Sequence, residues 1–427
     1  MPGEINSRGF QQWLRDEYRD GLKEVNLTAN RRQTSRLEIF SARARSLLET
    51  EEPLKVREFV ESINVFPVER DYNKILPHGS TSEKVAILCR NNGEVLKISG
   101  DLRKRRIIHN VRRQHSRWLL PIWVADLLNG QRRILTRDEL AGLNLSGQGE
   151  TGAPDRLFGL LQTLAGTDGP IVDMEKVRRI LTTEARLPDE LYERPLSSLT
   201  VSTIHQAKGR EFDRVYLLEP LDPDRNEDLM EEARVYYVAV TRARSDFRRL
   251  ERPKTYTWLT KCESNRWREE GKYVNGKTRL VSMEIGLEMD IDEESFVDCC
   301  LPGFKPHERQ RYIREEVKEG DFLVIALVED ETEYYGIYHG DRLIGRMSDR
   351  FTSGVREVMK STYERIRYLQ SDFKIYLPRC FSEVYVEQIY SVVRKPETVS
   401  PSVAEPYMSK GVWYAVSVAG MGKVHFD

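Results

Sequence analysis

The sequence predicts an α/β fold built on an open parallel sheet, followed by a separate β-rich region. Between residues 199 and 240 the apolar pattern gives a strand, a loop, a second strand, a loop and a helix. This alternation is typical of open α/β domains, whose ligands bind at the carboxyl ends of the strands, so Glu211 and Arg242 are expected to meet at that edge. From about residue 256, short strands with Gly-containing turns follow at close spacing, which predicts a small β-barrel or sandwich.

Each element of the central segment has local support. Residues 199–205 are β-branched and alternate in polarity, which predicts a strand that Gly209 then interrupts. Residues 215–218 form an apolar run between charges, as in a buried strand of a parallel sheet. Asn226 is the predicted N-cap of the helix. The apolar residues of that helix recur at helical spacing: Leu229, Ala233, Tyr236, Tyr237 and Val240.

The region upstream contains further predicted elements of the same kind. Residues 5–24 carry one apolar helical face, and a short strand near residue 25 leads through a turn into a helix that ends near Leu48. Residues 49–80, punctuated by Pro and Gly, predict a loop-rich pair of strands. Residues 84–89 predict another buried strand.

A basic segment with interleaved aromatic residues lies between residues 102 and 123. Its basic and aromatic members are Arg103, Lys104, Arg105, Arg106, His109, Arg112, Arg113, His115, Arg117, Trp118 and Trp123. Such a segment can follow a phosphate backbone, with a ring available for stacking on a base. It is equally compatible with a solvated basic helix whose tryptophans lie in the core. Residues 142–154 predict a flexible loop, and residues 157–191 return to helix.

The C-terminal region predicts a binding module rather than an enzyme. An Asn-Gly pair at residues 275–276 suggests a hairpin. Strands are predicted at residues 322–328, 334–338 and 343–346, followed by a helix at 353–370 and two further strands. No catalytic constellation is evident in this part of the sequence.

The composition narrows the class of protein. The 427 residues are enough for two or three domains, and the 39% hydrophobic content supports real cores. The net charge is -1, so only local patches can indicate nucleic acid. The five cysteines show no CxxC spacing, which predicts reduced thiols and no metal site. With no membrane-length apolar run and no signal-type N-terminus, a soluble cytoplasmic protein is expected.

Two motifs about thirty residues apart are the most specific feature of the sequence. Residues 203–213 read TIHQAKGREFD, and residues 231–244 read EEARVYYVAVTRAR. The pair resembles motifs V and VI of the UvrD/Rep-like superfamily 1 DNA helicases, in their usual order and spacing. Residues 25–37 resemble motif IV of the same helicases, with Asn30 and Arg32 matching and Arg31 in place of the usual aromatic residue.

The resemblance covers residues 20 to 250 and implies the C-terminal half of such a helicase. The implied fold is a RecA-like parallel sheet of the P-loop NTPase type that lacks its own phosphate loop. The expected domains are the second RecA-like domain at residues 1–100 and 195–255, a helical insertion at 101–194 and a β-rich accessory domain at 256–427. The strand at 84–89 resembles one that ends near the nucleotide and DNA. A solvated strand end is at least as compatible with Asn91 and Asn92.

The resemblance also implies roles for individual residues at the nucleotide. Arg242 and Arg32 would be the catalytic arginines that reach the γ-phosphate, with Arg242 acting like an arginine finger. Glu211 would hydrogen-bond the ribose, and Gly209 and Arg234 would lie near the nucleotide cleft.

Single-stranded DNA is the second ligand that the resemblance implies. Thr203 and His205 would face the DNA, and the basic segment adds the candidate contacts Arg105, Arg112 and Trp118. ATP with Mg²⁺ would be shared with a partner, because GxxxxGK[ST] and a magnesium carboxylate after a buried strand are absent from the sequence. The chain would begin at its own Met1 where motif III has just ended, and no ATP hydrolysis is expected from it alone.

Two classes of function remain open at this stage. The chain is either one half of a two-polypeptide ATPase that translocates 3′ to 5′ on single-stranded DNA, or a non-catalytic DNA- or protein-binding module that has kept the fold. The γ-phosphate arginines favour the first class, since a binding module does not need them. The missing half of the cleft favours the second class for the isolated chain.

Overall fold

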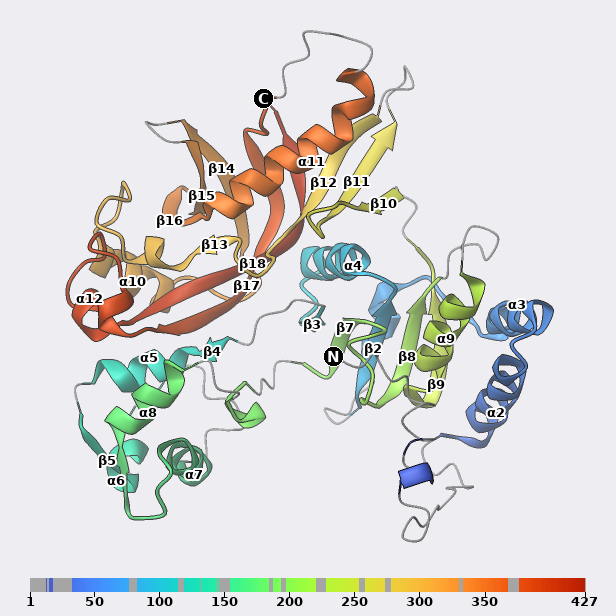
Figure 1. Ribbon diagram of the computed structural model, residues 1–427, viewed down its shortest axis with the longest axis horizontal. Helices are drawn as coiled ribbons and strands as arrows, with labels where there is room; N and C mark the ends of the chain where they lie inside the picture. Colours follow the sequence, from blue (N-terminus) through green and yellow to red (C-terminus); the bar gives the residue numbers. More distant parts are fainter. Residues whose placement is uncertain are drawn as a thin grey trace.

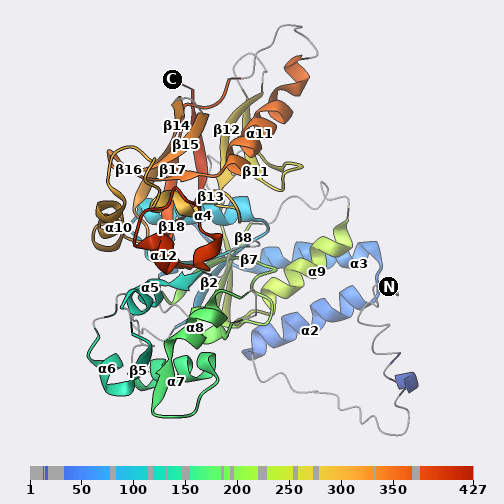
Figure 2. The same cartoon turned by 60° about the vertical axis from the view of Figure 1, so that its left-hand side comes forward.

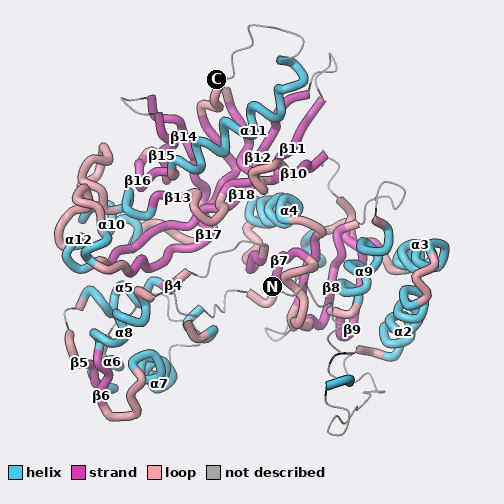
Figure 3. The backbone as a smooth tube through the Cα atoms, in the orientation of Figure 1, coloured by secondary structure: helices cyan, strands magenta, loops and turns pink. Residues whose placement is uncertain are grey.

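The strands of the protein form one parallel and one antiparallel sheet, with a small third sheet (Figures 1 and 3). A computed structural model describes residues 13, 15–17, 33–76, 83–113, 119–130, 132–143, 145, 154–183, 187–192, 197–219, 228–252, 258–272, 278–329, 333–367 and 376–426. The parallel sheet with its helices confirms the predicted α/β class, and the antiparallel sheet confirms the β-rich region.

The parallel sheet has six strands in the order β1-β9-β8-β2-β7-β3, and all five of its pairings are parallel. Its strands are β1 (Val68–Glu69), β2 (Val85–Cys89), β3 (Asn110–Arg112), β7 (Leu199–Thr203), β8 (Phe212–Leu218) and β9 (Ala243–Leu250). β2 is buried throughout, as its apolar sequence predicted. β7 is also buried throughout, although its sequence alternates in polarity. The sheet extends past residue 100, since β3 forms its edge.

Helices cover both faces of this sheet. α2 (Ser35–Glu49), α3 (Pro53–Ser62) and α9 (Leu229–Val240) lie on one face, and Figure 2 shows them side by side. α4 (Asn92–Lys104) covers the other face through Val95, Ile98 and Leu102. The two faces therefore have separate apolar cores on either side of β2, as in a doubly wound domain.

Two local predictions for this domain are wrong. Residues 49–80 contain α3, two short 3₁₀ turns (Ile63–Val65 and Tyr72–Ile75) and only the two-residue β1, instead of a pair of strands. Pro53 stands at the start of α3, where a missing N–H costs nothing, so it begins a helix and does not mark a loop. The N-cap of α9 is Asp228, whose carboxylate accepts the N–H of Glu231 at 2.9 Å; Asn226 lies outside the described residues.

The antiparallel sheet contains ten strands, so the β-rich region is one continuous sheet and not a two-sheet sandwich. Its strands are β4 (Leu120–Pro121), β10 (Trp258–Lys261), β11 (Trp267–Lys272), β12 (Thr278–Ile285), β13 (Ile291–Asp292), β14 (Phe322–Glu329), β15 (Glu333–His339), β16 (Arg342–Met347), β17 (Cys380–Val393) and β18 (Val412–His425). The associated helices are α10 (Pro306–Glu315), α11 (Asp349–Arg367) and α12 (Tyr407–Lys410), with 3₁₀ turns at Glu293–Phe296 and Pro396–Thr398. β11 and β12 pair antiparallel on either side of the predicted hairpin turn.

The insertion between β3 and β7 is a small lobe that packs on the antiparallel sheet. Its elements are α5 (Ile122–Asn129), β5 (Ile134–Thr136), α6 (Arg137–Ala141), α7 (Pro154–Ala165), β6 (Ile171–Asp173), α8 (Met174–Leu181) and a 3₁₀ turn at Asp189–Tyr192. Ser391 of β17 accepts the N–H of Ala125 at 2.9 Å and donates to the carbonyl of Pro121 at 2.7 Å. The lobe and the antiparallel sheet share one apolar core.

α4 joins the parallel sheet to the antiparallel sheet. Its outer face carries Leu96, which packs with Tyr385, Ala419 and Met421 of the β-rich region. A β-carbon on Gly93 would come within 3.1 Å of the β-carbon of Trp267, so any larger residue here would have to displace Trp267 slightly. One helix therefore belongs to the core of both regions.

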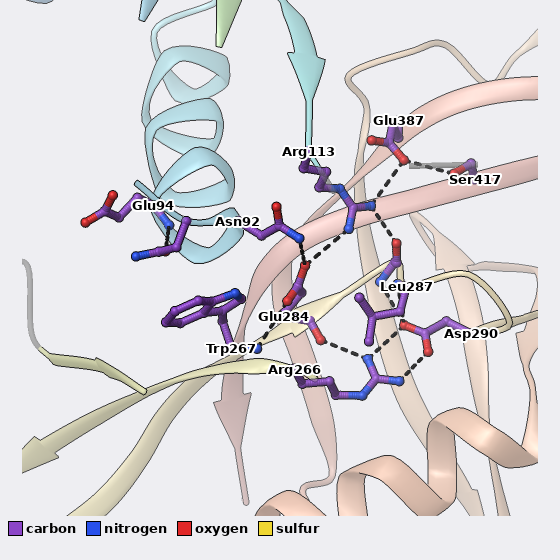
Figure 4. A network of polar contacts seen from close by, with 12 residues as sticks. Asn92, Glu94, Arg113, Arg266, Trp267, Glu284, Leu287, Asp290, Glu387 and Ser417 are labelled. Atoms are coloured by element: carbon purple, nitrogen blue, oxygen red, sulfur yellow. Dashed lines mark hydrogen bonds and ion pairs between the residues drawn. The ribbon is translucent and has the colours of Figure 1, made fainter. Parts of the chain in front are cut away.

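A buried network of charged groups completes this junction (Figure 4). Arg113, which directly follows β3, is fully buried and lies 3.4 Å from carboxylate oxygens of both Glu284 and Glu387. Asn92 of α4 donates to the same Glu284 oxygen at 3.4 Å. Burial raises the pKa of Glu284, and the Arg113 guanidinium offsets part of that rise.

Among the residues that the structure describes, no helix combines the length and the apolar character that crossing a bilayer requires.

Candidate functional site

The two motifs of the sequence meet at the amino-terminal edge of the parallel sheet. The loop at residues 204–211 runs back from the carboxyl end of β7 to the amino end of β8, because β7 and β8 are parallel. α9 likewise runs back and ends beside the start of β9. The expectation that Glu211 and Arg242 meet at the carboxyl ends of the strands is therefore wrong. They meet, but at the opposite edge.

Arg242 ties motif VI to motif V. Its guanidinium donates to three oxygens: the carbonyl of Val238 at 3.2 Å, the carbonyl of Arg210 at 3.1 Å and Oγ1 of Thr241 at 3.1 Å. The carbonyl of Arg242 accepts the N–H of Phe212 at 2.9 Å. Beside it, Oε2 of Glu211 accepts from Nε and Nη2 of Arg244 at 2.9 and 2.8 Å. Arg242 and Glu211 thus share one edge.

The motif V loop is a compact turn that presents cations to solvent. The N–H of Ala207 donates to the carbonyl of Thr203 at 3.2 Å, and the N–H of Arg210 donates to the carbonyl of Ala207 at 3.0 Å. Gly209 has a φ of +83°, a left-handed conformation that favours glycine. Lys208 and Arg210, on either side of it, are exposed.

The segment after motif IV reaches the same edge. The Gln33 amide donates to the carbonyls of Val240 and Ala243 at 3.2 and 2.9 Å. The N–H of Thr34 donates to the carbonyl of Arg244 at 2.8 Å, and α2 begins at the next residue. Arg32 itself lies outside the described residues.

This edge has the chemistry of an anion site. It combines the guanidinium groups of Arg242 and Arg244 with the amino end of α2, where Thr34 makes no side-chain capping bond. Unpaired N–H groups and the helix dipole favour negative charge at such an end. The donors present therefore fit a polyphosphate. Within the described ranges no three His, Cys, Asp or Glu side chains form a group that could hold a metal ion.

The opposite, carboxyl-terminal edge holds the predicted DNA contacts. Thr203 ends β7 and is buried, with its hydroxyl accepting the N–H of Gln206 at 3.3 Å. His205 is exposed, and burial together with Arg90 lowers its pKa. Arg112 ends the neighbouring β3 and is half-buried; burial and then the charge of Arg210 lower its pKa. Thr203, His205 and Arg112 therefore come to one edge, although Thr203 points into the fold.

Three other candidate residues do not join either group. Arg234 lies in the middle of α9, exposed, with Nη2 3.3 Å from Oε1 of Glu51, and is eight residues from Arg242, about 12 Å along the helix. Arg105 caps the far end of α4, where its guanidinium lies 5.3 Å from the Tyr72 ring. Trp118 lies outside the described residues.

The described residues of the basic segment, 102–113 and 119–123, do not form the continuous track that one reading of the sequence predicted. Arg103 stacks 4.1 Å from the Tyr385 ring centroid, and Arg113 is fully buried. Lys104 is paired with Glu383 at 2.8 Å, and His109 is buried. Trp123 belongs to the apolar core. Much of this charge therefore serves the junction with the β-rich region, and solvated cations such as Arg105 are separated from Arg112 by the length of the sheet.

One charged group at the carboxyl-terminal edge, Arg90, follows the strand that resembles one ending near the nucleotide and DNA, but it was not named as a site residue. The Arg90 guanidinium lies 2.8 and 3.0 Å from the two carboxylate oxygens of Glu232, in the first turn of α9. The backbone N–H of Arg90 donates to the Glu94 carboxylate, which also accepts a hydrogen bond from the Arg252 guanidinium at 2.6 Å. The only sequence feature that pointed to this group was the run of polar residues after the apolar strand at 84–89. The partner of Arg90, Glu232, lies 142 residues further along the chain.

Comparison with known families agrees with this arrangement. Residues 155–247 match the model of the UvrD-like helicase C-terminal domain, and this match includes both motifs V and VI as far as Phe247. No curated protein matches the chain. The chain contains a UvrD-like helicase C-terminal domain.

Proposed function

We propose that this chain supplies the second RecA-like domain of an ATP-dependent helicase or translocase that moves 3′ to 5′ on single-stranded DNA. Its amino-terminal sheet edge would face the γ-phosphate of ATP, with Arg242 as the arginine finger and Arg32 as a second arginine. Glu211 would bind the ribose, and Gly209 would allow the loop its turn. The phosphate loop and the magnesium carboxylate would come from another RecA-like domain, in a partner or elsewhere in a longer protein.

The observation that carries this proposal is the shared edge of motifs V and VI. Arg242 bonds the carbonyl of Arg210, and Glu211 is the next residue along that loop. Arg244 and the start of α2 add positive charge beside them. A guanidinium is permanently charged and offers a planar fork, which is what stabilising charge on a transferring phosphoryl group requires.

Nucleotide would compete with the bonds that Arg242 and Glu211 make within the chain. Arg242 would exchange carbonyl partners for phosphate oxygens, which form stronger, charge-assisted hydrogen bonds. Glu211 would exchange Arg244 for a ribose hydroxyl, leaving Arg244 to pair with phosphate. Both exchanges would move the end of α9 and the motif V loop, because Arg242 joins them.

The DNA side of the proposal rests on the opposite edge. His205 and Arg112 would contact the strand directly, and Thr203 would act by holding the turn that presents His205. Arg105, Trp118 and Arg234 stay as weaker candidates for DNA or nucleotide contacts, because none of them is joined to either group of residues by a described contact.

Photolabelling with a γ-phosphate-linked photoreactive ATP analogue tests this assignment. The chain would be purified natively with whatever phosphate-loop ATPase accompanies it, labelled, and digested. We expect labelled peptides from residues 208–214 and 241–249, and competition by ATP. Label confined to the partner or to the β-rich region would contradict it. Purification without any ATPase would favour the alternative of a binding module derived from a helicase.

A further inference from the structure

α9 spans the distance between the two edges of the parallel sheet. Its last turn accepts hydrogen bonds at the amino-terminal edge, where Arg242 donates to the carbonyl of Val238 and Gln33 donates to the carbonyl of Val240. Its first turn lies at the carboxyl-terminal edge with Glu232. Twelve helical residues cover about 18 Å, so one rigid element touches both groups of candidate residues.

The first turn of α9 is held by a single ion pair across the chain. Nε of Arg90 lies 2.8 and 3.0 Å from the two oxygens of Glu232, whose side chain is 9% exposed. The backbone of Arg90 is also held, since its N–H donates to Oε2 of the buried Glu94 at 2.8 Å. The other oxygen of Glu94 accepts Arg252, the second residue after β9. The pair thus joins the ends of β2 and β9 to α9.

The same pair lies beside the motif V histidine. The N–H of Ile204 donates to the carbonyl of Cys89 at 2.9 Å, and the residues that follow these two are His205 and Arg90. The charges that reach the His205 imidazole come from Arg90, Glu231, Glu232 and Lys208. Arg90 therefore contacts α9 on one side and the environment of His205 on the other.

We propose that Arg90 is a positioning residue that couples α9 to the motif V turn. Its ion pair with Glu232 fixes the N-terminal end of α9 against His205, so that movement begun at Arg242 reaches the DNA edge. The coupling rests on the proposed function, whereas the positioning of His205 does not. Arginine suits this role because its guanidinium is permanently charged and its Nε reaches both carboxylate oxygens of Glu232.

Histidine NMR on the full chain tests the positioning. Burial and then Arg90 lower the pKa of His205, while Glu231 and Glu232 raise it. Removing the Arg90 cation in Arg90→Gln must therefore raise that pKa, and Arg90→Lys must restore most of the original value. The seven histidines would be labelled at Cε1 and the signal assigned with His205→Gln.

The control variant replaces another arginine that is paired with a glutamate, far from the site. Arg356→Gln removes the exposed partner of Glu333, 2.7 Å away, in the β-rich region, and should leave the His205 titration unchanged. Thermal unfolding would establish that each variant is folded. An unfolded Arg90→Gln would leave Arg90→Lys against Glu232→Gln as the comparison, with a lowered His205 pKa expected in Glu232→Gln and little change in Arg90→Lys. An unchanged His205 pKa in folded variants would overturn the positioning role.

DNA-stimulated ATP turnover of the assembled enzyme tests the coupling. Arg90→Gln should reduce the ratio of DNA-stimulated to basal turnover by about tenfold, a typical coupling between two sites, with basal turnover retained. An unchanged ratio would overturn the coupling while leaving the proposed function intact. Failure of the proposed function would instead appear as basal turnover that does not respond to Arg242→Ala.

Discussion

Single side chains decide the chemistry of each edge of the parallel sheet. At the amino-terminal edge Arg242 uses its fork to bond carbonyls of both motifs, which places a cation beside Glu211. At the opposite edge the buried Thr203 holds a turn, and the exposed His205 faces solvent. Residue type alone predicted these roles only in part, because exposure depends on where the loop between β7 and β8 turns.

His109 is a buried side chain whose protonation should control stability. Its Nδ1 lies 2.8 Å from the carbonyl of Ile107 and its Nε2 lies 2.7 Å from Oγ of Ser99, which suits a neutral ring that donates to one and accepts from the other. Burial lowers the pKa of His109 to about 4. The unfolded chain binds a proton near pH 6.5, so stability is full above that pH and falls as the pH falls towards 4.

The resulting prediction concerns acid sensitivity. Between pH 7 and pH 5 this one group should lower the free energy of unfolding by about 2 kcal/mol. His109→Gln, measured by denaturant unfolding at both pH values, should lose that part of the pH dependence. His307→Gln, at a side chain that is 68% exposed, is the matched control and should keep it. Equal pH dependence in the two variants would show that His109 does not titrate in this way.

At the scale of elements, α4 makes contacts with the β-rich region that its own sequence does not indicate. Its N-cap Asn91 accepts the N–H of Glu94 at 2.9 Å, so this residue has a structural role where a nucleotide or DNA contact was considered. Its neighbour Asn92 bonds Glu284 in the β-rich region. The strand before it and the motifs around it were predictable from local pattern. The junction was not, because its partners, such as Glu284, Tyr385 and Met421, belong to segments far along the chain.

The buried pair of Arg113 and Glu284 gives the prediction for this junction. Arg113→Ala should lower the free energy of unfolding by about 3–5 kcal/mol, since it leaves a buried carboxylate without its cation. Arg113→Met with Glu284→Gln should lose less, because both charges are removed. Chemical denaturation followed by circular dichroism would measure both.

An exposed ion pair provides the comparison for these variants. Arg356→Ala removes the partner of Glu333 on the surface and should change stability by at most about 1 kcal/mol. If Arg113→Ala costs no more than Arg356→Ala, the buried network does not hold the two regions together.

At the scale of the whole molecule, the RecA-like sheet, the insertion and the antiparallel sheet are joined through two contacts. α4 and Arg113 link the parallel sheet to the β-rich region, and α5 links the insertion to the same region. The sequence predicted the α/β class, the insertion and the β-rich region from periodicity and motif order. It did not predict that the β-rich strands form one sheet, because strand pairing between distant segments leaves no local signal.

ATP turnover by the native complex, with Arg242→Ala compared against Arg356→Ala, tests the central claim most directly. The claim is that this domain closes a nucleotide site with a cation from the end of α9. We predict that Arg242→Ala lowers DNA-stimulated turnover by about 10³-fold, as loss of an arginine finger does, while Arg356→Ala leaves it unchanged. A folded Arg242→Ala complex that turns over ATP at the unmodified rate would contradict the claim.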